Sequence, residues 1–461
     1  MPKANELPST PGISYFSPAH DISPGALNPA AKNRPTLFTP IRIRDVILKN
    51  RIIVAPMCQY STAPDGPNIG ALTDYHLATL GHYALKGAAM VMIEATGVQY
   101  NGRISPYCPG IWQDEQIESV RRVAEFIRSQ GGIPAIQLAH AGRKASTTPN
   151  WIAAKNKLSS MRSTKDVGGW PDNVVGPMGG AEECWDGKGL SEAGGYWPPR
   201  ALSVKEIREM TQDWAKAAKR SVKAGIEAIE IHAAHGYLIS EFLSPITNRR
   251  TDSYGGSFEN RIRILIEIVQ AIRKVIPSGM PLFVRVSSTE WMEDTDVGKQ
   301  YGSWDVESTI RLAKLLPALG VDLLDVSSGG NHPLQRINMF KSNDYQTKIA
   351  AQIRRELRAE NKQMLIGAVG LITEAEQARD IVETSSAPAS SIIKEKEELA
   401  EAKTAVAMTD ANGEKEPMAD VILVARQFMR EPEWVLRVAA MLKVDVAWPS
   451  QFLRVRLGPK L

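Results

Sequence analysis

Residues 231–261 read IHAAHGYLISEFLSPITNRRTDSYGGSFENR, and the rest of the chain is organised around this stretch. Two histidines three positions apart, His232 and His235, are followed by Tyr237. The apolar run 225–231 just before them predicts a short buried strand. Polar side chains at the end of a strand and ahead of a long loop are typical of an active site on an α/β scaffold.

Strand-like and helical patterns alternate through most of the chain. The eight predicted strands cover residues 51–57, 88–96, 133–140, 225–234, 281–288, 321–329, 363–370 and 419–426. Helices are predicted over 73–87, over 114–130, after the capping boxes Ser203–Glu206 and Thr373–Glu376, after Ser257, and near Pro432, which suits a first turn. Eight alternations, with no G-x-G-x-x-G after the first strand, predict an α/β fold, a (β/α)8 TIM barrel rather than an open dinucleotide-binding sheet.

Segments outside this alternation define the domain organisation. Residues 1–36 hold several prolines and no period, which predicts an extended N-terminal arm, either disordered or laid across the surface. Residues 37–461 are expected to form one barrel domain that begins with a hairpin turning at Arg44-Asp45. Residues 141–202, rich in Gly, Pro and Trp, follow the third strand and are expected to cap the catalytic face. Residues 384–418 mix Ser, Ala and Pro with Lys and Glu, and are expected to form a solvated insert on the opposite face.

The composition narrows the class of protein. A net charge of +4 over 461 residues gives no strong argument for nucleic acid, and 43% hydrophobic residues suffice for a large core. The three cysteines, Cys58, Cys108 and Cys184, form no C-x-x-C pair, which argues against disulfides and iron–sulfur clusters. No apolar run approaches the ~20 residues of a membrane span, and the N-terminus has no signal pattern, so a cytoplasmic protein is expected.

Side chains at the C-terminal ends of barrel strands face the active site. By that criterion His232 and His235 have three alternative roles: metal ligands, histidines of the core, or paired donors to a substrate oxygen. No metal is expected, since no third ligand and no acidic cluster stands out. Tyr237 is a suitable acid towards a carbanion.

The seventh and eighth strands end in Gly367–Gly370 and in Ala425-Arg426. Barrels commonly bind phosphate at this position, through backbone N–H groups and a helix N-terminus. Glycine lets the backbone approach a phosphate closely, and Arg426 can supply two donors. We therefore expect a phosphate group of a cofactor there.

Several longer motifs occur in one order between Leu37 and about Arg456. They are APMCQY (55–60), IQLAHAGRK (136–144), SYGGS (253–257), FVRVS (283–287), GAVG (367–370) and QFLR (451–454). Together they resemble the Old Yellow Enzyme family of FMN-dependent ene-reductases, and most of all its branch with a cysteine in the first strand, sometimes called thermophilic-like. The resemblance implies a barrel that binds FMN and uses NADPH or NADH, and it favours the donor role for the two histidines.

The resemblance also implies roles for individual residues. Those expected at the flavin are Pro56, Met57, Cys58, Ala95, Gln137, Arg285, Gly370, Ala425 and Arg426. Those expected at the substrate are Tyr60, His232, His235 and Arg454, the last from a neighbouring subunit, which implies a homodimer or a higher homo-oligomer. Arg285 should place positive charge beside flavin N1, where negative charge accumulates on reduction. Two positions depart from the family pattern: Ala425 stands where relatives usually have glycine, and Phe452 where tyrosine is common.

The activity implied is reduction of the C=C bond of small α,β-unsaturated carbonyl or nitro compounds. The nicotinamide gives a hydride to FMN, the alkene then takes it with its oxygen held by His232 and His235, and Tyr237 supplies the proton. One alternative, a dienoyl-CoA reductase type of enzyme, needs cysteines for an iron–sulfur cluster, and these are not present. The other is a flavin-binding protein used for isomerisation or a non-catalytic role. Replacement of Tyr237 would mark that alternative, so its presence favours the reductase.

Overall fold

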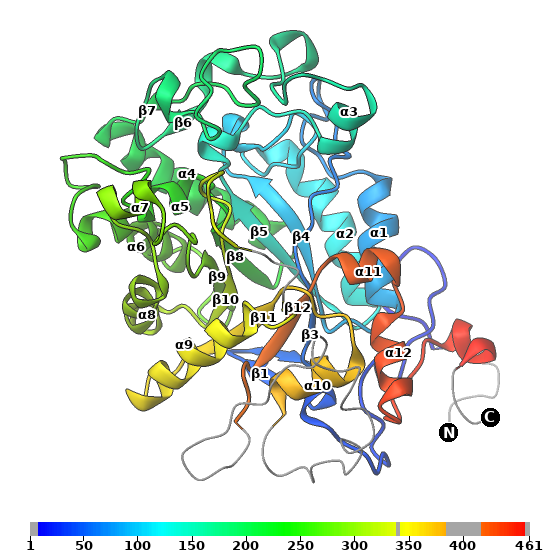
Figure 1. The fold of residues 1–461 in the computed structure, drawn as a ribbon. Coiled ribbons are helices and arrows are strands. Elements are labelled where there is room, and N and C mark those ends of the chain that lie inside the picture. Colours follow the sequence, from blue (N-terminus) through cyan, green and yellow to red (C-terminus); the bar gives the residue numbers. More distant parts are fainter. Residues whose placement is uncertain (1–7, 338–341, 384–415, 457–461) are drawn as a thin grey trace.

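The computed structural model describes residues 8–337, 342–383 and 416–456. Eight parallel strands form a closed barrel in the order β3-β4-β5-β8-β9-β10-β11-β12, and β12 pairs back onto β3 (Figure 1). Their bounds are β3 Ile52–Val54, β4 Met90–Gly97, β5 Ile133–Ala139, β8 Ala228–Ala233, β9 Leu282–Ser287, β10 Leu323–Ser327, β11 Leu365–Val369 and β12 Val421–Val424. Each coincides with a predicted strand to within a few residues, so the predicted (β/α)8 barrel is confirmed.

Helices surround the barrel and cover the outward side chains of its strands (Figure 1). They are α1 Asp74–Leu85, α2 Ile117–Ser129, α4 Val204–Lys223, α5 Leu238–Leu243, α6 Phe258–Arg273, α7 Asp296–Tyr301, α8 Val306–Leu315, α9 Thr347–Ala359, α10 Ala375–Val382, α11 Arg426–Arg430 and α12 Trp434–Met441. Two helix starts are where the sequence predicts them: the Ser203 and Ser257 hydroxyls accept backbone N–H groups of the first turns of α4 and α6.

Two predicted helix features are wrong in detail. The capping box predicted at Thr373 and Glu376 lies one residue later, because the N-cap of α10 is Glu374 and its partner is Gln377. The Gln377 amide oxygen accepts the backbone N–H of Thr373 at 3.1 Å and that of Glu374 at 3.5 Å, so Gln377 takes the place predicted for Glu376. Pro432 does not lie in the first turn of α12 but precedes the N-cap of that helix.

The N-terminal end of the barrel is filled by apolar side chains. The predicted hairpin is present at this end as β1 Ile41–Ile43 and β2 Val46–Leu48 (Figure 1). Alternate residues of each barrel strand point inward, and the apolar layer formed there includes Ile43, Leu48, Ala228, Phe283 and Leu323. The polar side chains of the interior therefore lie nearer the C-terminal ends of the strands.

Residues 141–202 lie beyond those C-terminal ends (Figure 1). They contain α3 Asn150–Lys155 and a small sheet of β6 Val175–Gly176 with β7 Arg200–Ala201. The described part of the N-terminal arm bonds to the segment after α12, where Gly25 donates to the carbonyl of Ala447 at 2.8 Å. Of the insert predicted at 384–418, only 416–418 fall within the described residues.

Candidate active site

His232 is the first residue of the site and lies buried near the C-terminal end of β8. Its Nδ1 accepts the N–H of Ala234 at 3.2 Å, so the neutral ring carries its proton on Nε2. Burial lowers the pKa of His232 well below 6.5, and the positive charges of Arg285 and Lys144 lower it further. The ring is therefore a neutral donor rather than an imidazolium ion.

His235 follows in a left-handed conformation, with φ of +61°. Its backbone N–H donates to Ser287 Oγ at 2.8 Å, and its Nε2 lies 2.7 Å from Ser327 Oγ. Burial first, and Arg285 second, lower the pKa of His235 well below 6.5. These anchors on β9 and β10 hold the ring beside that of His232, with the centroids 5.2 Å apart and the planes nearly perpendicular.

Tyr237 is the N-cap residue of α5, and its ring centroid lies 4.9 Å from that of His232. Lys144 Nζ lies 5.2 Å from the tyrosine ring centroid and donates to the carbonyls of His235 and Gly330. Burial raises the pKa of Tyr237 well above 10, so the hydroxyl stays protonated at neutral pH. The turn after β8 thus brings two imidazoles and a phenol together at the mouth of the barrel.

Gln137 on β5 and Arg285 on β9 lie on either side of β8. Gln137 Nε2 donates to Glu230 Oε1 at 2.7 Å, which turns the amide oxygen of Gln137 away from that carboxyl. Arg285 is paired with His232 in the strand register, and its Nε lies 3.2 Å from Asp325 Oδ2. Among the described residues this Nε has no hydrogen-bond partner although it is buried.

The segment after β3 reaches the mouth of the barrel with partly exposed side chains at Pro56, Met57, Cys58 and Tyr60. It is held by Glu94 of β4, whose Oε2 accepts the N–H of Gln59 at 2.5 Å. The neighbouring Ala95 is buried in a cluster against which Cys58 packs. A hydrogen bond with Cys108, together with burial, raises the pKa of Cys58 well above 9, so this side chain is a neutral thiol.

Gly370 and Arg426 lie at the ends of the neighbouring strands β11 and β12. Gly370 has φ of +107°, and a Cβ at this position would lie 2.4 Å from Gln346 Nε2. Arg426 is exposed and begins α11, directly after Ala425. A glycine backbone beside an exposed arginine suits a phosphate group.

Arg454 is not brought to this site within one chain. It is exposed on the short helix η10 Ser450–Val455. In that segment the ring of Phe452 lies 3.6 Å from the Nζ of Lys86, the residue that ends α1. The C-terminal ends of barrel helices lie at the N-terminal ends of the strands, away from His232.

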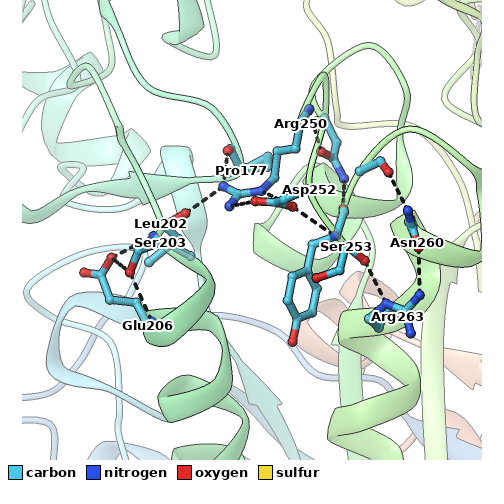
Figure 2. A network of polar contacts seen from close by, with 12 residues as sticks. Pro177, Leu202, Ser203, Glu206, Arg250, Asp252, Ser253, Asn260 and Arg263 are labelled. Carbon is cyan, nitrogen blue, oxygen red and sulfur yellow. Dashed lines mark hydrogen bonds and ion pairs between the residues drawn. The ribbon is translucent and has the colours of Figure 1, made fainter.

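The later part of residues 231–261 connects residues 141–202 to the barrel (Figure 2). Arg250 Nη1 donates to the carbonyls of Pro177 and Leu202, which directly follow β6 and β7, at 2.8 and 2.6 Å. Its Nη2 pairs with Asp252 Oδ2 at 2.5 Å, and Asp252 Oδ1 accepts the N–H of Tyr254. One nearly buried guanidinium therefore connects the small sheet of β6 and β7 to the loop that leads into α6.

Two carboxyl groups of the barrel interior, Glu230 and Asp325, are missing from the site predicted by sequence. The sequence criterion selects residues at the strand ends. Glu230 and Asp325 lie two positions before His232 and Ser327, deeper in the barrel interior. The sequence signal is an acid inside a largely apolar strand, but the predicted strands 225–234 and 321–329 each hold a second acid, Glu227 and Asp322. Tyr345 is a further residue that the sequence did not indicate. Its hydroxyl lies beside Gly370, 3.8 Å from where a Cβ of that residue would be.

Within residues 8–337, 342–383 and 416–456, no group of three or more His, Cys, Asp or Glu side chains could hold a metal ion. Across the same ranges, no helix has both the length and the apolar character that crossing a membrane requires.

The sequence comparisons give one family and several relatives of known type. The model of the NADH:flavin oxidoreductase / NADH oxidase family matches residues 36–395. An NADH:flavin oxidoreductase of Gibberella zeae is 44% identical over 375 residues, which cover 81% of this chain and 85% of that protein. The NADPH dehydrogenase of Bacillus subtilis is 35% identical over 418 residues, covering 91% and 98%.

Solved structures show the same fold. Morphinone reductase is 25% identical with a TM-score of 0.62, covering 93% of this chain and 94% of that one. For a 2-naphthoyl-CoA reductase complex the TM-score is 0.66 at 23% identity, which shows the fold alone, and this chain spans 52% of its length.

The chain belongs to the NADH:flavin oxidoreductase / NADH oxidase family. It is an oxidoreductase of the Old Yellow Enzyme type that works with FMN and a nicotinamide, NADPH or NADH. The residues present fit FMN: the Nε of Arg285 is buried without a hydrogen-bond partner among the described residues, and a Cβ at Gly370, where φ is +107°, would lie 2.4 Å from the Gln346 side chain.

Proposed function

We propose that this enzyme reduces the C=C bond of small alkenes activated by a carbonyl or nitro group. The observation that best supports this is the perpendicular contact of the His232 ring with the rings of both His235 and Tyr237. Two neutral imidazoles suit an oxygen on which negative charge develops. A phenol that stays protonated beside them suits proton transfer to carbon.

Each of the three side chains has one task in this proposal. His232 donates from Nε2, and His235, whose Nε2 faces Ser327, donates from Nδ1 to the same substrate oxygen. Tyr237 gives the proton of its hydroxyl to the α-carbon and regains it from solvent. A carbanion is a much stronger base than a phenolate, so the raised pKa of Tyr237 does not prevent this transfer.

When bound, FMN supplies the hydride transfer from NADPH or NADH to the alkene. We assign to the flavin the residues Pro56, Met57, Cys58, Ala95, Gln137, Arg285, Gly370, Ala425 and Arg426. We assign to the substrate Tyr60 and, from a neighbouring subunit, Arg454. We also propose that the protein belongs to the cysteine-containing branch through Cys58, that it is cytoplasmic and that it forms a homodimer or a higher homo-oligomer. In the same proposal, residues 141–202 cap the catalytic face.

The test is the separate measurement of two half-reactions in Tyr237→Phe. Reduction of the bound flavin by NADPH should keep its rate, and reoxidation by cyclohexenone should slow by about 10²–10⁴-fold, the usual contribution of a general acid. Tyr254→Phe is the control, because its hydroxyl donates to Glu267 at 2.8 Å, away from the barrel mouth. Unchanged reoxidation in Tyr237→Phe would show that another group delivers the proton. Failure of cyclohexenone to reoxidise the wild-type enzyme would overturn the proposed activity.

A further inference from the structure

Glu230 and Asp325 form a pair of buried carboxyl groups inside the barrel. Both have no exposed surface. In the strand register Glu230 is paired with Gln137 of β5, and Asp325 with Arg285 of β9. Two residues earlier on β8, β9 and β10 the interior side chains are apolar, so one side of the pair is closed by the apolar layer.

The hydrogen bonding of this pair is incomplete. Glu230 Oε1 accepts from Gln137 Nε2, but Glu230 Oε2 and both carboxylate oxygens of Asp325 have no hydrogen-bond partner among the described residues. The contact between Asp325 Oδ2 and Arg285 Nε is an ion-pair contact at 3.2 Å. An incompletely bonded polar layer of this kind lowers the stability of the fold, and a functional role would explain why it is kept.

The charge balance of the layer points to one shared proton. The groups that act on Glu230 are Gln137 from β5, Arg285 from β9 and Asp325 from β10, and His232 lies two residues further along its own strand. Arg285 is the one permanent cation among these, and His232 is neutral. Two carboxylates at low dielectric would therefore exceed the positive charge available. Burial, and then the charge of Asp325, raise the pKa of Glu230 to about 8, and burial raises that of Asp325.

We propose that Glu230 and Asp325 are positioning residues for the flavin and that they carry one proton between them. The inference rests on the placement of Gln137 and Arg285 at the flavin proposed above. Glu230 accepts the Gln137 N–H and so orients the amide oxygen outwards, and Asp325 holds the guanidinium of Arg285. The negative charge beside Gln137 and Arg285 then depends on whether Glu230 is protonated.

This arrangement links the proton to flavin reduction. Reduction by the nicotinamide adds negative charge at the N1 end of the flavin, beside Arg285. Added negative charge favours the protonated form of Glu230, so a proton from solvent binds its carboxyl group when reduction occurs at a pH where it was ionised. No bond other than this O–H forms in the layer.

The experiment is the midpoint potential of bound FMN as a function of pH, measured by spectroelectrochemical titration of the holoenzyme. Above about pH 8 the wild-type midpoint potential should fall more steeply with pH, because reduction is then accompanied by uptake of one additional proton. Glu230→Gln, which keeps an acceptor for Gln137, should lose this change of slope. Asp325→Asn removes a negative charge beside Arg285 and should raise the potential. Asp420→Asn is the matched control, since this buried acid pairs with Arg354 at the start of β12 and should leave the potential unchanged.

A wild-type profile without the change of slope would overturn the shared proton, and this measurement needs no variant to fold. The same change of slope in Glu230→Gln would assign it to another group and overturn the shared proton equally. If Asp325→Asn has the potential of the Asp420→Asn control, Asp325 is a purely structural residue. For Glu230, FMN affinity in Glu230→Ala should fall well below that in Glu230→Gln, and equal affinities would exclude the orienting role. A holoenzyme with these properties but no activity on alkenes would contradict only the proposed function.

Discussion

His76 Nε2 lies 3.6 Å from Glu94 Oε1, and both side chains are almost completely buried behind the segment that follows β3. The other oxygen of Glu94 accepts the N–H of Gln59, between Cys58 and Tyr60. His76 Nδ1 accepts the N–H at the N-cap of α1, which leaves the ring proton on the side of Glu94. The pair therefore supports a segment that we assign to both the flavin and the substrate.

Replacement of Glu94 by leucine should weaken this segment. The N–H of Gln59 would be buried without an acceptor, so the free energy of unfolding should fall by about 1–3 kcal/mol. FMN affinity should fall about tenfold, equivalent to roughly 1.4 kcal/mol, because the weakened segment is one that we assign to the flavin. Urea unfolding and flavin fluorescence titration measure the two effects. Glu94→Gln keeps an acceptor and is the control; a leucine variant as stable as this control would refute the supporting role.

The buried histidines should make the stability of the protein depend on pH. Their folded pKa lies well below 6.5, so as the pH falls below about 6.5 the unfolded chain binds protons at His232 and His235 and the folded chain does not. The free energy of unfolding should then decrease with falling pH, by up to about 1.4 kcal/mol per pH unit for each histidine. Urea unfolding between pH 7 and 5 measures this slope. His232→Asn should reduce the slope of the free energy of unfolding against pH by the contribution of one proton. His82→Asn, at an exposed position, should change this slope much less.

Loss of Arg250 should loosen the attachment of residues 177–202 to the barrel. Arg250→Ala removes charged hydrogen bonds to the carbonyls of Pro177 and Leu202, so the free energy of unfolding should fall by about 1.5–3 kcal/mol. Limited proteolysis should cleave within 177–202 faster than in the wild type. Arg220→Ala, which breaks a surface pair with Asp114, should cost less than about 1 kcal/mol and leave cleavage unchanged. Equal cleavage in the two variants would contradict an anchoring role for Arg250.

A side chain at Gly370 should impair FMN binding. Gly370→Ala adds a Cβ 2.4 Å from Gln346 Nε2, at a φ of +107°. We expect FMN affinity to fall at least about tenfold, equivalent to roughly 1.4 kcal/mol. Gly66→Ala is the control, because Gly66 also has positive φ, +73°, but a Cβ there meets nothing within 4 Å. It should cost about 1 kcal/mol of stability and leave FMN affinity unchanged. Equal FMN affinities in the two variants would exclude Gly370 from the phosphate site.

Sequence reasoning succeeded where the information is local. The strands and the helix starts at Ser203 and Ser257 follow from periodicity and from side chains that can cap a nearby N–H group. At α10 the sequence predicted a box from Thr373 to Glu376, one residue before the box that the structure has. Structure favours the later one because the Gln377 amide reaches the N–H of Thr373.

The site was predicted less completely than the fold. The rule that strand ends face the site predicts His232 and Arg285 from the strand order alone, and the structure pairs these two residues in the register of β8 and β9, while their roles stay predictions. The same rule does not select Glu230 and Asp325, which lie two residues before the strand ends. Their role depends on the residues of other strands that surround them, and the sequence does not show these contacts. Whether Arg454 reaches a neighbouring subunit stays a prediction.

The sequence by itself therefore determined the barrel class, the turn that carries His232 and His235 and the family motifs, because each depends on residues close together in the chain. The tertiary structure decided which distant residues meet, such as Gln137 with Glu230, 93 positions apart. It also decided their charge states, because desolvation and neighbouring charges act only after the barrel has closed. His232 and His235 are neutral, and Glu230 favours its protonated form, for that reason.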